Sequence, residues 1–226
     1  MTKVKICGIT RGEHALAAAE AGADFIGLVL APSRRQIALD EAIPLALAIH
    51  SINRHPQVIG VFVNFEINAV NRIADAMQLD WVQLSGSESW QYCREITRPV
   101  IKVIHIAGQS SADIISSVET GYKTMADKQF KFLLDTSKRN FYGGTGETFD
   151  WNIAKEVAGK YPVVIAGGLT PENVGTLIEQ VRPWAVDVSS GVETSGKKDT
   201  AKIIAFIQAV RKADDALGQS NSSKDS

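Results

Sequence analysis

The segment Val163–Glu193, which reads VVIAGGLTPENVGTLIEQVRPWAVDVSSGVE, alternates between two kinds of pattern. An apolar run over residues 163–166 is followed by two glycines, and a helical pattern then covers residues 171–180. A second apolar run over residues 185–189 leads into another glycine-bearing turn. Short runs rich in Val and Ile are typical of buried strands. The segment therefore predicts two parallel strands joined by a helix.

The same alternation extends outward from this segment through most of the chain. Apolar runs that predict strands occupy residues 3–9, 24–30, 58–63, 81–84, 100–106, 130–135, 163–166 and 185–189. Helical patterns cover residues 12–20, 39–52, 68–77, 111–120, 152–159, 171–180 and 199–212, with the weakest pattern at residues 88–96. Eight strands that alternate with helices predict an α/β fold, a single-domain (β/α)8 TIM barrel with a closed parallel sheet.

An open, doubly wound sheet is the alternative architecture. In its dinucleotide-binding form a glycine fingerprint follows the first strand, whereas this chain reads Cys7-Gly8-Ile9-Thr10 there. We place the barrel at residues 1–213. Residues 214–226 are rich in Ser, Asp and Lys, so we expect them to form a disordered polar tail.

The composition limits the possible partners and compartments. The chain has 226 residues, 45% of them hydrophobic, and a formal net charge of -1, which indicates neither a nucleic-acid nor a membrane-surface partner. No apolar run reaches the roughly 18 residues of a membrane-spanning helix, and no signal peptide is visible. Two cysteines do not form a disulfide framework, and the four histidines lack metal-ligand spacing. We therefore expect a cytoplasmic protein that uses no metal and no cofactor.

Two predicted strands carry reactive side chains at their C-terminal ends, where barrel enzymes place their chemistry. Because side chains alternate along a strand, Lys5 and Cys7 share one face of the first strand, and apolar residues take the other face. Asp135 ends the sixth strand on the face that it shares with Lys131 and Leu133, opposite Phe130, Phe132 and Leu134. An inward thiol and an inward carboxyl could act as base and acid on a bound substrate. The alternatives are a small buried cysteine and a loop-capping aspartate.

Glycine-bearing loops follow the last three predicted strands. They contain Gly143-Gly144-Thr145-Gly146, Gly167-Gly168 and Ser189-Ser190-Gly191. Glycine lets backbone N–H groups approach an anion, and the loops after the seventh and eighth strands hold phosphate in many barrels. Together the three loops predict a phosphate site.

Two further features lie at strand ends. Pro32-Ser33-Arg34-Arg35 follows the second strand, and a guanidinium there could hold a carboxylate by two parallel hydrogen bonds. The alternative is a solvated basic turn. His105 ends the fifth strand, but the pattern assigns it no role.

These motifs resemble those of phosphoribosylanthranilate isomerases. The resemblance begins with Lys5-Ile6-Cys7-Gly8-Ile9-Thr10-Arg11 and covers residues 3 to 210 in the same order. Its other parts are Gly60–Asn64, Leu134-Asp135, Gly143–Gly146, Phe149–Trp151, Ala166–Val174 and Val186–Glu193. Other phosphate-binding barrels share the glycines but lack the Ile-Cys-Gly-Ile-Thr start, so the set is specific.

The resemblance implies an activity and a role for each site residue. These enzymes perform an Amadori rearrangement in L-tryptophan biosynthesis, from N-(5-phosphoribosyl)anthranilate to 1-(2-carboxyphenylamino)-1-deoxyribulose 5-phosphate. By resemblance, Cys7 is the general base, Asp135 is the general acid, and Arg35 binds the anthranilate carboxylate. The remaining implied contacts are to the substrate from Gln83, Ser85 and Asp187, and to its phosphate from Gly144, Gly168, Ser190 and Gly191. We expect a monomer or a homodimer.

The implied mechanism fits these residues. Asp135 would donate its proton to the furanose ring oxygen, the ring would open to a Schiff base, and the Cys7 thiolate would remove the proton on C2. A thiol suits this task because a few per cent of it is ionised near neutral pH. Asp135 must in turn keep its proton at that pH.

Two positions depart from the family pattern. Ser85 stands where these enzymes usually carry a histidine, and it shares a face with Gln83 at the border of the pocket. The turn at residues 31–35 is also shorter than usual, so Arg34 is an alternative to Arg35.

Two other functions are alternatives to the isomerase. One is an aminoaldose-phosphate isomerase of histidine biosynthesis, in which a carboxylate stands at the position of Cys7. The other is a non-catalytic relative that binds a phosphate ligand. The presence of both Cys7 and Asp135 favours the phosphoribosylanthranilate isomerase.

Overall fold

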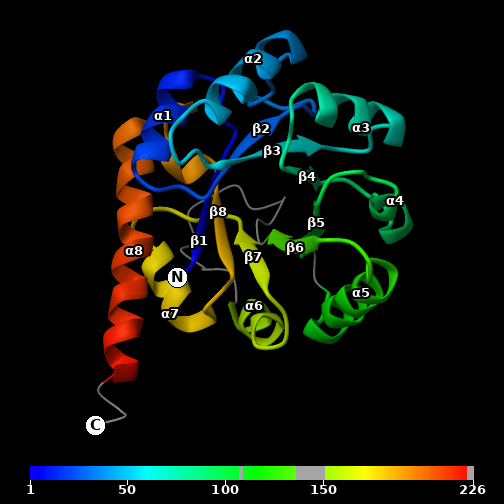
Figure 1. Ribbon diagram of the computed structural model, residues 1–226. Helices are drawn as coiled ribbons and strands as arrows, with labels where there is room; N and C mark the ends of the chain where they lie inside the picture. The colour runs from blue at the N-terminus through cyan, green and yellow to red at the C-terminus, as the bar shows by residue number, and fades with distance from the viewer. Residues whose placement is uncertain (107–108, 136–150, 223–226) are drawn as a thin grey trace.

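Eight parallel strands pair in chain order and the last pairs with the first, so the sheet closes into a barrel (Figure 1). The structure is a computed structural model that describes residues 1–106, 109–135 and 151–222. The barrel strands are β1 (Lys3–Cys7), β2 (Phe25–Val29), β3 (Gln57–Phe62), β4 (Trp81–Leu84), β5 (Val100–His105), β6 (Phe130–Asp135), β7 (Val163–Ala166) and β8 (Ala185–Val188). The predicted (β/α)8 barrel is confirmed.

Helices form the outer ring of the molecule (Figure 1). They are α1 (Gly12–Glu20), α2 (Leu39–His50), α3 (Ile67–Ala76), α4 (Trp90–Arg94), α5 (Ser111–Thr124), α6 (Trp151–Ala158), α7 (Val174–Val181) and α8 (Thr200–Ser222). Between β8 and α8 lie a 3-10 helix, η1 (Ser190–Val192), and a small antiparallel pair, β9 (Glu193–Thr194) and β10 (Lys197–Lys198). The helices provide the crossovers that parallel strands require.

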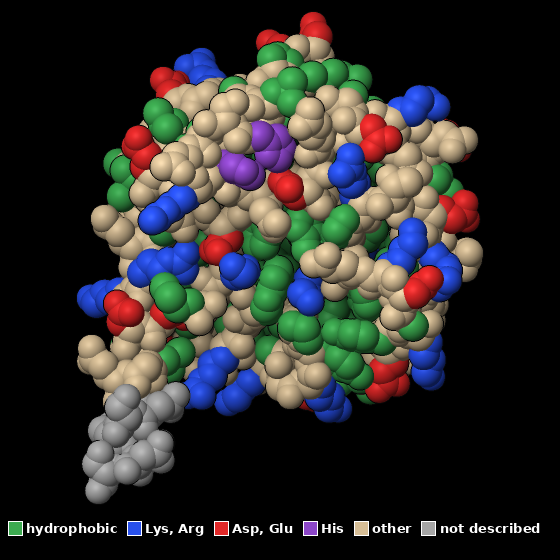
Figure 2. Space-filling view, viewed as in Figure 1, with side chains coloured by type: hydrophobic (Ala, Val, Ile, Leu, Met, Phe, Trp, Pro, Cys, Tyr) green, Lys and Arg blue, Asp and Glu red, His purple; other side chains and the backbone are tan. Residues whose placement is uncertain are grey.

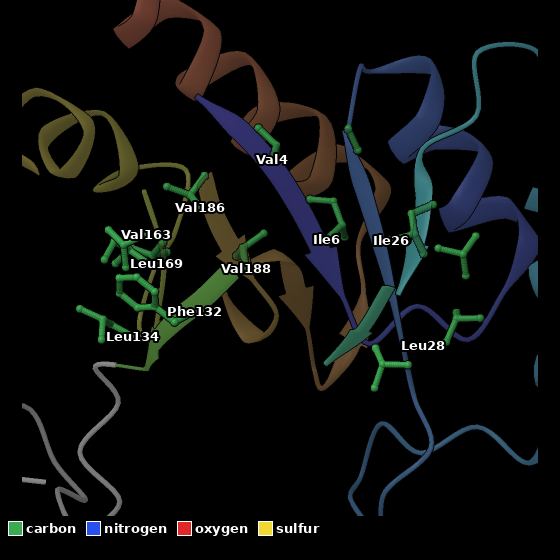
Figure 3. Close-up of a cluster of buried hydrophobic side chains, with 14 of the residues drawn as sticks. Val4, Ile6, Ile26, Leu28, Phe132, Leu134, Val163, Leu169, Val186 and Val188 are labelled. Carbon is green, nitrogen blue, oxygen red and sulfur yellow. The ribbon is translucent and has the colours of Figure 1, made fainter. Parts of the chain in front are cut away.

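Alternation along the strands divides the buried side chains into two layers. The outer layer lies between sheet and helices, and Figure 3 shows the part formed by Val4, Ile6, Ile26, Leu28, Phe132, Leu134, Val186 and Val188. The inner layer fills the barrel and includes Phe25, Ile59, Trp81, Ile101, Leu133 and Val164. Since Val4 and Ile6 take the outer side of β1, the structure places Lys5 and Cys7 on the inner side, as expected.

The first strand ends at Cys7 rather than at Ile9, where the sequence pattern placed its end. Gly8 has a φ of +79°, in the left-handed region that glycine adopts most easily, so the extended chain stops there. The turn brings the N–H groups of Gly8 and Ile9 to the carbonyl oxygen of Gly27, at 2.8 and 3.2 Å. Cys7 is thereby the last residue of its strand.

The final helix continues past the boundary expected from composition. α8 runs to Ser222, so the expectation of a disordered tail from residue 214 is wrong for residues 214–222. Asp214 accepts hydrogen bonds from the backbone N–H and the hydroxyl of Thr2, both at 2.8 Å. Val210, Ala213 and Leu217 continue the apolar stripe of the helix against the core, so the polar residues between them belong to its solvated face. Residues 223–226 lie outside the described residues.

The face of the molecule in Figure 2 carries charged side chains of both signs, mostly around its margin, while apolar side chains gather near its centre. Within the described parts of the chain, no helix combines the length and the apolar character needed to cross a membrane.

Candidate active site

Polar and small residues of the barrel interior form a row across five strands. In the register of the sheet, His105 on β5 is the partner of Asp135 on β6, and Asp135 is the partner of Ala166 on β7. Ala166 is the partner of Asp187 on β8, which is in turn the partner of Lys5 on β1. Barrel closure therefore gathers residues from both ends of the chain toward the C-terminal ends of the strands.

Cys7 points into the barrel beside Gly27 of β2. The residue is 8% exposed. A Cβ atom added to Gly27 would lie 3.0 Å from the Cys7 sulfur and 3.0 Å from Lys5 Nζ, so the glycine leaves open the space beside both groups. Burial raises the pKa of the Cys7 thiol, and the Lys5 charge opposes this effect. The balance of these two influences decides how much thiolate is present.

Lys5 is a buried cation in direct contact with a buried carboxylate. Its Nζ donates to both carboxylate oxygens of Asp187, at 3.0 Å each, and the residue is only 1% exposed. Burial disfavours the charged amine, but Asp187 and Cys7 outweigh it, so the pKa of Lys5 lies above its ordinary value. Burial raises the pKa of Asp187, and Lys5 opposes that shift. Stability alone does not explain such a pair, because apolar residues of similar volume often stabilise a core as well or better.

Asp135 ends β6 in contact with His105. Its Oδ2 lies 3.5 Å from His105 Nδ1, and its side chain is 26% exposed, so a ligand in the barrel mouth can reach it. His105 Nε2 lies 2.9 Å from the Ser85 carbonyl oxygen, which can only accept, so Nε2 carries a proton and Nδ1 faces Asp135. Residues 136–150 lie outside the described residues.

Glu193 gathers three cations beside the end of β1. Arg35 donates to it from Nε and Nη2, Arg34 from Nη2 and Lys198 from Nζ. Burial disfavours the ionised carboxylate, but the hydrogen bonds from Arg35 and Lys198 outweigh this and hold the pKa of Glu193 below its ordinary value. Three cations around one carboxylate leave an excess of positive charge, which suits an anionic ligand.

The two arginines differ in their surroundings. The Arg35 side chain is 22% exposed and that of Arg34 is 59% exposed. A Cβ atom on Gly8 would lie 2.6 Å from Arg35 Cδ, so the glycine in the β1 turn permits the close approach of this arginine. Arg35 is thus the arginine that packs against the active-site turn.

The loops after β7 and β8 pack against each other. Gly167 and Gly168 have φ values of +100° and +64°, and the Asn173 side chain closes this loop by donating to the Gly168 carbonyl at 2.9 Å. A Cβ atom on Gly191 would lie 1.8 Å from the Leu169 carbonyl oxygen, so any larger residue would force the loops apart. Gly168, Ser190 and Gly191 therefore lie on adjoining loops, whereas Gly144 lies outside the described residues.

Gln83 and Ser85 lie near the end of β4. Gln83 Nε2 donates to Ser85 Oγ at 3.1 Å. Gln83 Oε1 is buried and has no hydrogen-bond partner among the residues that the structure describes. Ser85 and His105 also line a cleft of about 750 Å³ that opens beside β3, β4 and β5. An unused acceptor beside the barrel interior favours contact with a ligand that carries donors.

A model of one protein family matches residues 4–209, and its description is N-(5'-phosphoribosyl)anthranilate (PRA) isomerase. The chain belongs to this family. An N-(5'-phosphoribosyl)anthranilate isomerase of Dehalococcoides mccartyi is 50% identical over 215 residues, which are 95% of this chain and 98% of the relative. One from Roseiflexus sp. is 42% identical over 94% of this chain and 99% of the relative.

Solved structures of phosphoribosylanthranilate isomerases share the fold. The crystal structure of the enzyme from Thermotoga maritima superposes with a TM-score of 0.79 at 38% identity, covering 94% of this chain and 100% of that one. A second isomerase structure, with a TM-score of 0.76 at 36% identity and the same coverage, is a complex with reduced 1-(o-carboxyphenylamino)-1-deoxyribulose 5-phosphate. The family predicted from the sequence motifs is confirmed, and with it the isomerase activity and the place in tryptophan biosynthesis.

Sequence reasoning did not foresee three of the residues in this site. Lys5 was placed on the face of Cys7 but given no role, and the alternation rule could have marked it as a cation beside the thiol. The contact of His105 with Asp135 follows from their register on neighbouring strands. The contact of Glu193 with Arg35 depends on how two loops meet, and no sequence pattern near either residue predicts it.

Proposed function

We propose that this isomerase acts on N-(5-phosphoribosyl)anthranilate with Cys7 as general base and Asp135 as general acid. The observation that carries the proposal is the position of the two groups. A thiol ends β1 and a carboxyl ends β6, both on the inner side of the barrel. Each can then reach a different part of one substrate held in the mouth.

The reaction divides into two proton transfers that Asp135 and Cys7 perform at different atoms, followed by a tautomerisation. Asp135 gives its proton to the furanose oxygen while the C1–O bond breaks, and the anthranilate nitrogen supplies electrons to form a Schiff base. The Cys7 thiolate then takes the proton on C2, and the electrons move to give an enolamine. The enolamine gains a proton at C1 and loses the hydroxyl proton at C2, which yields the aminoketose. Substrate and product have the same composition, so no external oxidant or reductant takes part.

The cations around Glu193 support a carboxylate site. Arg35 offers a planar guanidinium that can bind the anthranilate carboxylate through two parallel hydrogen bonds. Glu193 holds Arg35 in place through hydrogen bonds, and Lys198 and Arg34 also donate to Glu193. We assign the carboxylate contact to Arg35 because it packs against the β1 turn.

The adjoining loops after β7 and β8 support a phosphate site. The backbone amides of Gly168, Ser190 and Gly191 are the groups that we assign to the phosphate, with Gly144 added on the basis of sequence. Gln83 would accept a hydrogen bond from the substrate through Oε1, which has no partner in the described parts of the chain, and Ser85 would border the same region. Asp187 would act on the substrate through Lys5, to which both of its oxygens are bound.

The test is a fluorescence assay of turnover on freshly made phosphoribosylanthranilate. Cys7→Ala and Asp135→Asn should each lower kcat by about 10²–10⁴-fold, with a much smaller change in KM. Cys93→Ala and Asp127→Asn are matched controls, because Cys93 is buried in the outer core and Asp127 pairs with Arg94 on the surface. Near wild-type turnover in both site variants would remove the assignment of base and acid.

Two outcomes of the same assay would favour other functions. A wild-type protein that binds the phosphorylated product without turnover would be a binding relative. Turnover of a two-phosphate aminoaldose would indicate the histidine-pathway isomerase.

We also propose a cytoplasmic location and a monomer or homodimer. Light scattering tests the assembly, and one related structure is described as that of monomers made from a dimeric isomerase of Thermotoga maritima.

A further inference from the structure

We propose that Lys5 and Asp187 are positioning residues that set the ionisation of Cys7, with Lys5 favouring the thiolate and Asp187 limiting it. The inference rests on the proposed role of Cys7 as the base. Two observations carry it: Lys5 Nζ lies 3.0 Å from each oxygen of Asp187, and Lys5 Nζ and the Cys7 sulfur would each lie 3.0 Å from a Cβ atom added to Gly27.

The donors of Lys5 account for this arrangement. An ammonium group has three N–H donors and no acceptor. Two of them reach the oxygens of Asp187, which leaves the third for the Cys7 sulfur on the same face of β1. Because Lys5 is almost fully enclosed, it cannot turn to water instead. The cation is therefore held between the Asp187 carboxylate and the Cys7 thiol.

The charges around Cys7 come from several elements of the barrel. Lys5 precedes it on β1, Asp187 faces it from β8, and Lys198 of β10 adds a second cation. Asp135 of β6 acts on Asp187, and β2 presents only the uncharged Gly27. With the thiol neutral, Lys5 and Asp187 compensate each other. When Cys7 ionises, its thiolate becomes a second anion next to Lys5. The positive charge of Lys5 then stabilises both the thiolate and the Asp187 carboxylate, and this attraction is strong because the surroundings have a low dielectric constant.

This arrangement predicts shifts of opposite sign for the two partners. Without the Lys5 charge, the thiolate would face a lone buried carboxylate, so the thiol should ionise at higher pH. Without the Asp187 charge, the positive charge of Lys5 would stabilise the thiolate alone, so the thiol should ionise at lower pH. If Lys5 and Asp187 only supported the fold, their removal would not be expected to shift the Cys7 titration midpoint in opposite directions.

The experiment titrates Cys7 directly, by ultraviolet absorbance of the thiolate in a Cys93→Ala background. Lys5→Met should raise the midpoint by about one pH unit or more, which lowers the thiolate fraction roughly tenfold at a fixed pH below the midpoint. Asp187→Asn should lower the midpoint by a similar amount. The rising limb of kcat/KM with pH should move with the midpoint in each variant.

Two controls keep the outcome readable. Lys102→Met removes another buried lysine from a short ion pair, with Glu88 at 3.1 Å, and should leave the Cys7 midpoint in place. Lys5→Met leaves Asp187 buried without its partner and can fail to fold. In that case Lys5→Met/Asp187→Asn is compared with Asp187→Asn alone, and its midpoint should be the higher of the two.

Shifts of the same sign, or no shift in either variant, would overturn the inference. The titration needs no turnover, so it separates this inference from the proposed function. If Cys7→Ala remained active while the two midpoints moved apart, the base would have to be another group and the ionic control of Cys7 would stand. If Cys7→Ala were inactive and the midpoints did not move, only the role of Lys5 and Asp187 would fall.

Discussion

Replacing Gly27 by alanine is expected to damage turnover through the position of the thiol. The added carbon would lie 3.0 Å from the Cys7 sulfur, 3.0 Å from Lys5 Nζ and 3.2 Å from Cys7 Cα. Nonbonded carbon contacts are normally about 3.5–4.0 Å, so the side chains would have to move by roughly 0.5–1 Å. The strands cannot separate easily, because Cys7 and Gly27 are partners in the β1–β2 register. A displacement of this size should lower kcat by about 10- to 100-fold.

The same substitution should have a moderate effect on stability. Overpacking of a core typically costs about 1–3 kcal/mol. For a domain of this size each kcal/mol corresponds to about 2–4 °C in Tm, so a decrease of roughly 2–12 °C is expected. Steady-state kinetics on phosphoribosylanthranilate and a thermal melt followed by circular dichroism measure the two effects. The control is Gly218→Ala in α8, where a Cβ atom meets nothing within 4 Å and kcat should not change. An unchanged kcat in a folded Gly27→Ala variant would refute the reasoning.

Four further predictions concern the pH response and the edges of the site. Because burial raises the pKa of the Cys7 thiol, kcat/KM should rise with pH between about pH 7 and 9, and a flat profile over that range would argue against a thiolate base. The ionised form of Glu193 stabilises the fold above the ordinary carboxyl pKa of about 4.3, and this stability is lost as pH falls through the lower folded value. The Tm difference between wild type and Glu193→Gln should therefore be largest at neutral pH and shrink in acid. Truncation after Ala213 removes the carboxylate that accepts two hydrogen bonds from Thr2 and should cost about 1–3 kcal/mol in urea unfolding, whereas truncation after Gly218 should cost little. Ser85→Ala should lower turnover by less than about tenfold, and a thousandfold loss would place Ser85 in the catalytic machinery.

The inner positions of Cys7 and Asp135 could be predicted because a two-residue period holds along any strand. The pairing of Lys5 with Asp187 could not be predicted in this way. It joins β1 to β8 across 182 positions and exists only once the sheet has closed. The sequence pattern predicts which face of the strand a side chain occupies. The residue that this side chain contacts depends on the register between distant strands.

Composition was misleading at the end of the chain. Residues after 213 are mostly polar, which suggested disorder, but a helix on the surface of a barrel needs only a narrow apolar stripe. Leu217 continues that stripe, and Asp214 gains its partner from Thr2 at the other end of the sequence. The contact of Arg35 with Glu193 could not be predicted from the sequence either, because it depends on the path of two loops.

The pairing of β1 with β8 also has a consequence for the order in which a ribosome delivers the molecule. β1 emerges well before β8, and until β8 follows, one edge of β1 lacks the strand that covers it in the finished protein. Over the same period Lys5 lacks the carboxylate that neutralises it in the barrel. A chain that ended before Asp187 would have to enclose a lone ammonium, at a cost of several kcal/mol. This cost disfavours a closed interior around Cys7 in a nascent fragment, and the barrel that encloses the thiol is complete once β8 has paired with β1.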